Sequence, residues 1–169
     1  ITNCINASIK AKELVLDNIE ILNNIEEIVL KSVEAFNADK KMLLCGNGGS
    51  ASDAQHIASE LSGKFYLDRR PLFAEALHVN SSFVTAVAND YGYDNIYSRM
   101  VEAAGRDRDI LIGISTSGNS TNVVNAIERA NKIGMTTIGF TGEKGGKMND
   151  ICDITIRIPS TNTPRIQES

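Results

Sequence analysis

The sequence has 169 residues, of which 42% are hydrophobic and 22% are charged, and its formal net charge is −4. This length is typical of one domain with a sizeable core. The net negative charge argues against electrostatic binding to nucleic acid or to an anionic membrane surface. An anionic ligand must therefore be held by local backbone N–H groups and hydroxyls rather than by a broad basic patch.

The cysteines and the hydropathy of the chain predict a cytoplasmic protein. Cys4, Cys45 and Cys152 are odd in number and lack metal-site spacing, which suits a reducing compartment, and we expect all three to be buried thiols. No apolar run approaches the ~20 residues of a membrane span, and no signal-peptide pattern begins the chain. Because the sequence begins at Ile1 without a methionine and stops at Ser169 as a new segment begins, we expect it to be trimmed at both ends.

Residues 1–38 have the pattern of amphipathic helices. They contain no Gly or Pro, and their Ile, Leu and Val residues recur at helical spacing. We expect a break between two helices at Asn23-Asn24. Either these helices pack on their own domain, or they form an oligomer interface, since long amphipathic helices need a surface that buries their apolar stripe. Residues 1–38 are predicted as an N-terminal helical segment that precedes an α/β domain over residues 39–169.

From Lys41 onward, apolar strand candidates alternate with helical stretches. Strands such as Ile110–Ile114 are apolar on both faces, as a parallel sheet covered by helices requires. The alternation predicts a doubly wound α/β fold with a mostly parallel five-stranded sheet flanked by helices. Such sheets bind ligands at the carboxyl ends of the strands, beside the topological switch point. The predicted strands are 41–45, 73–79, 109–115, 135–140 and 153–158, and the predicted helices are 50–62, 81–88, 94–104 and 119–133.

The segment that begins at Gly46 has the composition of an anion site. The run Gly46-Asn47-Gly48-Gly49 turns the chain after an apolar strand, and Ser50 is placed to cap the helix that follows. Unpaired N–H groups and the positive end of the helix dipole make such a helix start an anion site. The loop lacks the Lys-Ser/Thr of a P-loop and the third glycine of the dinucleotide fingerprint, which excludes both nucleotide motifs.

His56 and Glu60 stand four residues apart in the same helix and therefore share one of its faces. Their nitrogen and oxygen donors suit one metal ion. Alternatively, Glu60 acts as a base that His56 orients, or the two residues form only a hydrogen-bonded surface pair. His78, at the end of a predicted strand, is interpreted as structural.

A second strand–loop–helix unit follows the strand at 109–114. Its loop, Ser115-Thr116-Ser117-Gly118-Asn119-Ser120, has four hydroxyls in six residues at a helix start. A Ser-rich helix cap is the alternative, but two such loops after apolar strands favour a phosphate cradle. Asn89-Asp90 are expected to end a helix just before Tyr91-Gly92-Tyr93-Asp94, and that turn either supplies polar groups to a ligand or is only a turn. Residues 141–147 are predicted as a mobile strand-to-helix turn.

Five segments in this order resemble the sugar isomerase (SIS) domain, and more closely the phosphoheptose isomerase family. They are Gly46-Asn47-Gly48-Gly49-Ser50, His56-Ile57-Ala58-Ser59-Glu60-Leu61-Ser62-Gly63, Asn89-Asp90-Tyr91-Gly92, Gly113-Ile114-Ser115-Thr116-Ser117-Gly118-Asn119-Ser120 and Arg165-Ile166-Gln167-Glu168. The resemblance covers essentially the whole chain. It implies an SIS phosphosugar-binding domain over residues 39–169. It also implies an aldose–ketose isomerase that converts sedoheptulose 7-phosphate to D-glycero-D-manno-heptose 7-phosphate, for the heptose precursors of lipopolysaccharide and other surface polysaccharides.

The resemblance also implies roles for individual residues. Glu60 is the expected catalytic base. His56, Glu60 and Gln167 are metal-site positions in members that carry zinc, so one Zn²⁺ per subunit is expected. The usual assembly is a homotetramer with the N-terminal helices at its centre. The implied substrate contacts are Asn47, Gly48, Gly49, Ser50, Glu60, Asn89, Asp90, Ser115, Thr116, Ser117, Ser120 and Gln167, of which the four hydroxyl residues from Ser115 to Ser120 hold the phosphate.

The family pattern also has a second catalytic and metal-binding histidine about two helical turns after Gln167, beyond the last residue of this sequence, and we attribute this difference to truncation. One alternative function is a non-catalytic SIS protein that binds the bacterial replication initiator. Such relatives lack the glutamate of the His-x-x-x-Glu pair, so the presence of Glu60 favours the isomerase. Another alternative is an isomerase or sensor of a different sugar phosphate, for example a hexose phosphate.

Spacing along the first of these helices suggests a site that is shared between subunits. The ten residues from Ser50 to Glu60 correspond to roughly 15 Å along a helix. That is long for one open-chain sugar phosphate to contact both ends. Glu60 would then serve the phosphate cradle of a neighbouring subunit.

Overall fold

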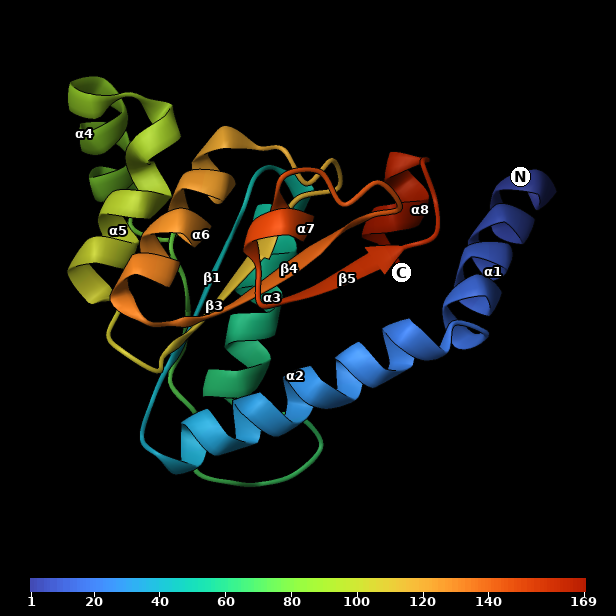
Figure 1. The fold of residues 1–169 in the computed structure, drawn as a ribbon, viewed down its shortest axis with the longest axis horizontal. Coiled ribbons are helices and arrows are strands. Elements are labelled where there is room, and N and C mark those ends of the chain that lie inside the picture. The colour runs from blue at the N-terminus through green and yellow to red at the C-terminus, as the bar shows by residue number, and fades with distance from the viewer.

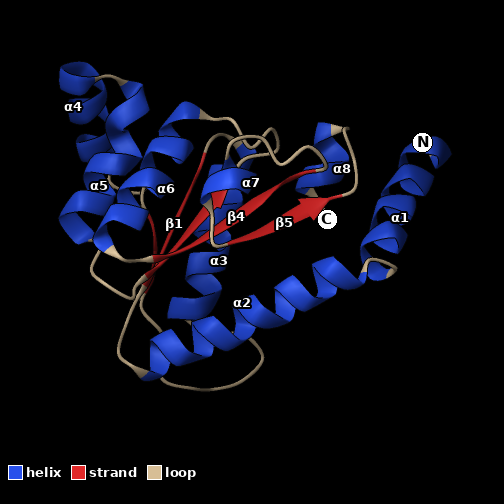
Figure 2. Cartoon of the chain, viewed as in Figure 1, coloured by secondary structure: helices blue, strands red, loops and turns tan.

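The computed structural model describes residues 1–169 and shows one sheet between two layers of helices (Figure 1 and Figure 2). All strand pairings are parallel, in the order β2-β1-β3-β4-β5. The predicted doubly wound α/β fold is therefore confirmed. The strands are β1 (Met42–Gly46), β2 (Ala74–Ala76), β3 (Ile110–Ile114), β4 (Thr136–Gly142) and β5 (Ile154–Ile158).

The helices follow the predicted alternation, with differences at short elements. β2 covers only three residues of the predicted strand 73–79, because it is an edge strand that pairs with β1 alone. The stretch predicted as a helix at 94–104 begins with a 3₁₀ turn, η1 (Tyr93–Asn95). The α-helices are α1 (Thr2–Leu16), α2 (Ile19–Asn37), α3 (Gly49–Ser62), α4 (Ser81–Tyr91), α5 (Ile96–Ala104), α6 (Thr121–Ile133), α7 (Met148–Ile151) and α8 (Thr163–Gln167).

The two faces of the sheet bury separate sets of side chains. In β1, Leu43 and Cys45 belong to the core cluster formed with α4, α5 and α6, whereas Met42 and Leu44 belong to the cluster formed with α2 and α3. Every residue of β1 and β3 is buried. This is the burial that a parallel sheet with helices on both faces requires, and it explains why these strands are apolar at every position.

The break between the N-terminal helices lies at Asp17-Asn18, so the prediction of a break at Asn23-Asn24 is wrong. Asn18 caps α2, because its side-chain oxygen accepts hydrogen bonds from the backbone N–H groups of Glu20 (3.0 Å) and Ile21 (3.2 Å). Asn24 instead lies within α2, where its side chain donates to the carbonyl oxygen of Thr155 in β5 (3.1 Å).

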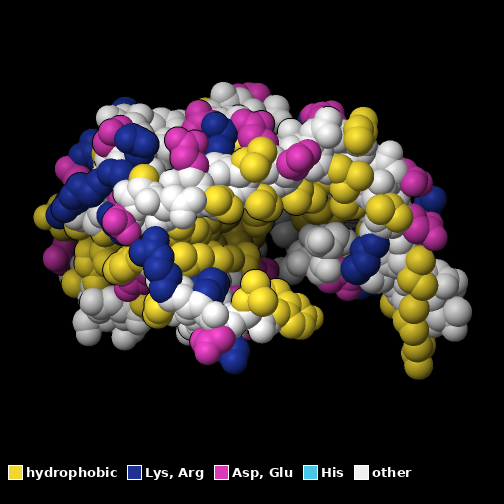
Figure 3. Space-filling model, turned by 90° about the horizontal axis from the view of Figure 1, so that it is seen from below, with side chains coloured by type: hydrophobic (Ala, Val, Ile, Leu, Met, Phe, Trp, Pro, Cys, Tyr) yellow, Lys and Arg dark blue, Asp and Glu magenta, His cyan; other side chains and the backbone are white.

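Much of the apolar surface of the N-terminal helices faces solvent. α2 packs along β5, and hydrophobic side chains form a band across the face that carries α2 (Figure 3). The oligomer interface and the boundary near residue 38 stay predictions. None of the helices is long and apolar enough to cross a bilayer. The exposed large hydrophobic residues of α1 and α2 include Ile5, Ile9, Ile19, Leu22, Ile25, Val29, Leu30 and Val33.

The cysteines differ from the expectation in two cases. Cys45 is buried in β1, and burial raises the pKa of its thiol far above the ordinary value. Burial also raises the pKa of Cys152, to about 12. Cys152 is only partly buried and Cys4 is exposed on α1, so the prediction of three buried thiols is wrong at both positions.

Candidate functional site

The register of the sheet brings the two predicted loops together. Gly46, the last residue of β1, pairs with Ile114, the last residue of β3. The loops that start at Asn47 and at Ser115 therefore leave the same edge of the sheet side by side. Along the chain, β1 is followed by β2, which pairs on one side of β1, and then by β3, which pairs on its other side. The carboxyl ends of β1 and β3 therefore also form the topological switch point of the sheet.

The first loop enters α3 through glycines that the local geometry requires. Gly48 has a φ of +57° and is the N-cap of α3, which begins at Gly49. Ser50 is already inside the helix and buried, so the prediction that it caps the helix is wrong. A Cβ at Gly49 would overlap the side-chain amide of Gln167. The backbone at Gly48 and Gly49 is thus left without side chains, and a ligand can approach it closely.

The second loop gathers three of the predicted hydroxyls. Ser115 Oγ lies 2.9 Å from Ser120 Oγ and 3.4 Å from Ser117 Oγ. Ser120 is the N-cap of α6, and its side chain makes no capping hydrogen bond. The backbone N–H of Thr121, the first residue of α6, donates to no backbone carbonyl in a turn, loop or cap. Hydroxyls and free N–H groups at the positive end of a helix dipole are the groups that bind a phosphate.

The turn after β4 packs against this loop. The prediction of a turn over 141–147 holds only from residue 143, because β4 continues through Gly142. The backbone N–H of Lys147 donates to Asn119 Oδ1 (3.0 Å), and the N–H of Met148 donates to the carbonyl oxygen of Gly118 (3.1 Å). Gly118 has a φ of +66°, and a Cβ there would overlap the carbonyl oxygen of Gly145. The shape of the loop is therefore set by its packing against this turn.

Gln167 reaches the start of α3 from the far end of the chain. Its Nε2 donates to Asp53 Oδ2 (2.6 Å). Both residues line a pocket of about 280 Å³ together with Ser50 and Thr116. Thr141 also lines this pocket, and its buried Oγ1 has no hydrogen-bond partner. Asp53 was missed by sequence reasoning, although it lies on α3 one turn before His56.

His56 and Glu60 form the predicted helix pair. His56 Nε2 lies 3.2 Å from Glu60 Oε1, and the two side chains are 75% and 37% exposed. Two donors that are each about 2.0–2.1 Å from a tetrahedral zinc lie roughly 3.3 Å apart, so this pair fits as two of its ligands. No group of three His, Cys, Asp or Glu side chains gathers in this structure. The pair therefore needs Gln167, or donors from elsewhere, to complete a zinc site.

Asn89 and Asp90 lie apart from the other predicted residues in the hydrogen-bond network. Both are exposed at the end of α4, and Asn89 Nδ2 donates to Asp90 Oδ1 (2.8 Å). No hydrogen bond joins either side chain to another predicted site residue. Their assignment to the substrate site rests on the resemblance and stays a prediction.

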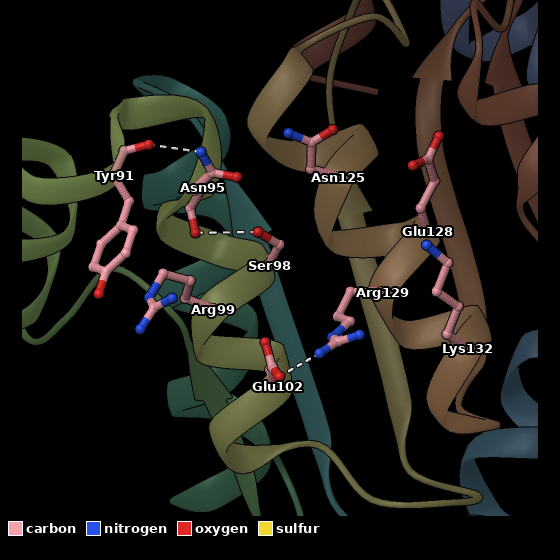
Figure 4. A pocket seen from close by; sticks show the side chains of 9 residues that line it. All are labelled: Tyr91, Asn95, Ser98, Arg99, Glu102, Asn125, Glu128, Arg129 and Lys132. Carbon is pink, nitrogen blue, oxygen red and sulfur yellow. Dashed lines mark hydrogen bonds and ion pairs between the residues drawn. The ribbon is translucent and has the colours of Figure 1, made fainter.

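A second, polar pocket of about 370 Å³ lies between α5 and α6 (Figure 4). None of the predicted site residues lines it. Its charges are largely matched within the pocket, because Arg129 pairs with Glu102, and Arg99 lies 3.8 Å above the ring centre of Tyr91. This arrangement is typical of solvated helix faces rather than of a site that receives an anion.

Comparisons with known proteins agree with the fold and with the motifs. The model of the SIS domain family matches residues 9–142. The phosphoheptose isomerase of Clostridium acetobutylicum is 52% identical over 165 residues, which cover 98% of this chain and 84% of that protein. The phosphoheptose isomerase of Aneurinibacillus thermoaerophilus is 48% identical over 165 residues, which cover 98% of this chain and 83% of that protein.

Solved structures show the same similarity. The phosphoheptose isomerase of Francisella tularensis superposes with a TM-score of 0.94 at 36% identity, covering 99% of this chain and 88% of that chain. The one from Neisseria gonorrhoeae gives a TM-score of 0.83 at 40% identity, covering 99% and 86%. The chain therefore belongs to the SIS domain family and, within it, to the phosphoheptose isomerases.

Proposed function

We propose that this protein interconverts sedoheptulose 7-phosphate and D-glycero-D-manno-heptose 7-phosphate. The observation that carries the proposal is the cluster of Ser115, Ser117 and Ser120 at the start of α6, beside the bare backbone of Gly48 and Gly49. The cluster is a phosphate site without a lysine, as the acidic composition requires. We place the reaction in the cytoplasm, in a homotetramer that supplies heptose precursors of surface polysaccharides.

The reaction moves one proton between adjacent carbons. Starting from the ketose, a base removes a proton from C1 while O2 gains one, which gives an enediol. A proton then returns to C2, and the O1 proton leaves, so that the aldehyde forms at C1. Glu60 is the proposed base, since a carboxylate held near a substrate carbon performs this step. Phosphate binding at Ser115–Ser120 supplies remote binding energy that orients the reacting carbons.

Zinc is the proposed cofactor, with His56, Glu60 and Gln167 as the residues that would hold it. When bound, such an ion would stabilise negative charge on the substrate oxygens. Gln167 suits this role because the hydrogen bond from its Nε2 to Asp53 holds the amide in place and leaves Oε1 free to accept. Asp53 would then act on the metal site only through Gln167.

The direct test incubates the full-length protein with sedoheptulose 7-phosphate in the presence of Zn²⁺ and measures the aldose 7-phosphate that forms. Fructose 6-phosphate, a shorter ketose phosphate, is assayed in parallel. We expect turnover of the heptose phosphate and little or none of the hexose phosphate. Preferential turnover of the hexose phosphate would reassign the substrate, and no turnover of either would refute the isomerase.

We also propose that each site combines residues of two subunits. His56 is 75% exposed, and Glu60 is its only hydrogen-bonded side-chain partner in the chain, which supports a pair that faces a neighbour. Mixed oligomers of Glu60→Ala protomers and Ser115→Ala/Ser120→Ala protomers should then regain part of the activity that each parent lacks. Mixed oligomers that stay as inactive as their parents would refute the shared site.

A further inference from the structure

Two asparagine side chains at the switch point form a mutual pair. Asn47 Nδ2 donates to Asn122 Oδ1 (2.9 Å), and Asn122 Nδ2 donates to Asn47 Oδ1 (2.8 Å). Asn47 belongs to the glycine loop after β1, whereas Asn122 lies in the first turn of α6 and is only 3% exposed. The pair therefore links the glycine loop directly to the helix that begins at the phosphate loop.

Two further hydrogen bonds fix which way each amide points. The backbone N–H of Val123 donates to Asn122 Oδ1 (3.0 Å), and the hydroxyl of Tyr93 lies 3.2 Å from Asn47 Oδ1, to which it donates. Because a backbone N–H can only donate, the atom it meets on Asn122 is the oxygen. The nitrogen of Asn122 then faces Asn47 Oδ1. Asn47 consequently keeps one amide N–H that no group within the chain accepts.

The same helix also holds the segment from which Tyr93 comes. Asn125, one turn after Asn122, projects from α6 on the side of the α4–α5 segment (Figure 4), and its Nδ2 donates to the carbonyl oxygen of Asp94 (2.9 Å). The hydroxyl of Tyr97 donates to the carbonyl oxygen of Gly46. Burial raises the pKa of Tyr97 far above its ordinary value, so this donor stays protonated. The glycine loop, η1 and α6 are thereby joined by side chains around Asn47.

We infer that Asn122 is a positioning residue, which holds the Asn47 amide so that its free N–H points at an oxygen of the bound sugar phosphate. This role rests on the proposed function. It requires that Asn122 both donate to and accept from Asn47. Tyr93 is the second positioning residue, because its hydroxyl completes the acceptor side of Asn47.

The test replaces Asn122→Asp and measures kcat/KM for sedoheptulose 7-phosphate as a function of pH. A carboxylate accepts from Asn47 but cannot donate to it, so we expect kcat/KM at neutral pH to fall roughly 10- to 100-fold. A protonated carboxyl group has one donor and one acceptor and reproduces the amide pattern. Because burial disfavours the charged form, part of the loss should recover as the pH falls into the mildly acidic range, relative to the wild-type profile.

The matched control is Asn131→Asp, which makes the same chemical change in the last turn of the same helix, where the side chain contacts neither Asn47 nor the segment that carries Tyr93. Its pH profile should follow that of the wild type. Thermal unfolding of each variant, at neutral pH and in the mildly acidic range, shows whether recovered activity merely reflects recovered folding. If Asn122→Asp does not fold, Tyr93→Phe decides, since it removes only an exposed hydroxyl and should lower kcat/KM a few-fold.

A loss that does not change with pH, or wild-type kcat/KM in Asn122→Asp, would overturn the positioning role. With the Asn122 variant unfolded, an unchanged kcat/KM in Tyr93→Phe would overturn it equally. These results differ from a failure of the proposed function, in which the wild-type protein itself has no activity with sedoheptulose 7-phosphate.

Discussion

Replacing Glu60→Gln is expected to lower the turnover of sedoheptulose 7-phosphate by about 10²- to 10⁴-fold, because an amide cannot accept the proton that a catalytic carboxylate removes. The substitution keeps the size of the side chain. Glu60 is also half-exposed on α3, so the fold should be retained. Initial rates of aldose formation at saturating substrate and zinc measure the effect, with circular dichroism as the check on folding.

Gln55→Ala is the matched control for Glu60→Gln. Gln55 lies on the same helix and is exposed, and its side chain makes no hydrogen bond within the chain. Its variant should turn over substrate at the wild-type rate. A Glu60→Gln protein that kept more than about a tenth of the wild-type rate, well above what loss of a general base allows, would show that another group is the base.

The second large effect is on stability, at the edge of the sheet opposite the site. We expect Asp109→Ala to lower the free energy of unfolding by about 3–5 kcal/mol, the usual cost of breaking a buried ion pair. Asp109 is 1% exposed and accepts hydrogen bonds from Lys41 Nζ (2.5 Å), from the backbone N–H of Lys41 (3.1 Å) and from that of Arg106 (2.8 Å). Its removal leaves all three donors without this acceptor.

Urea unfolding of the wild type and of Asp109→Ala measures this loss. The control is Glu27→Ala, which breaks the exposed pair with Lys31 (3.6 Å) on α2 and should cost less than about 1 kcal/mol. If both substitutions lowered the free energy of unfolding equally, the Asp109 carboxylate would contribute no more to stability than an exposed carboxylate does.

The order of strands and helices could be predicted because most elements have a clear local signal. β1 and β3 are apolar at every position, and α6 ends at Ile133 and is capped by Gly134, whose φ of +90° suits a glycine. β2 was predicted too long because the extent of an edge strand depends on its partner. The helix break was misplaced because Asn18 and Asn24 are the same residue type, and only the packing of α2 on β5 decides which one caps a helix.

The candidate site likewise combines features that the local sequence predicts with contacts that it does not predict. The loops at Gly46 and Ser115 could be located from their glycines and hydroxyls, which are local features. The Asn47–Asn122 pair joins residues 75 positions apart, and the Asp53–Gln167 contact joins residues 114 positions apart. Both depend on the strand register and on the path of the chain after β5, which leave no pattern in the sequence near these residues.

The enediol mechanism is tested most directly by running the reaction in D₂O and examining the aldose product by NMR. A base that takes the C1 proton of the ketose into an exchangeable carboxyl group delivers solvent deuterium to C2. The account predicts deuterium at C2 of the aldose and, in the reverse direction, at C1 of recovered sedoheptulose 7-phosphate. Aldose that carried at C2 only protium moved from C1, even after many forward and reverse turnovers, would indicate direct hydride transfer and would contradict the role assigned to Glu60.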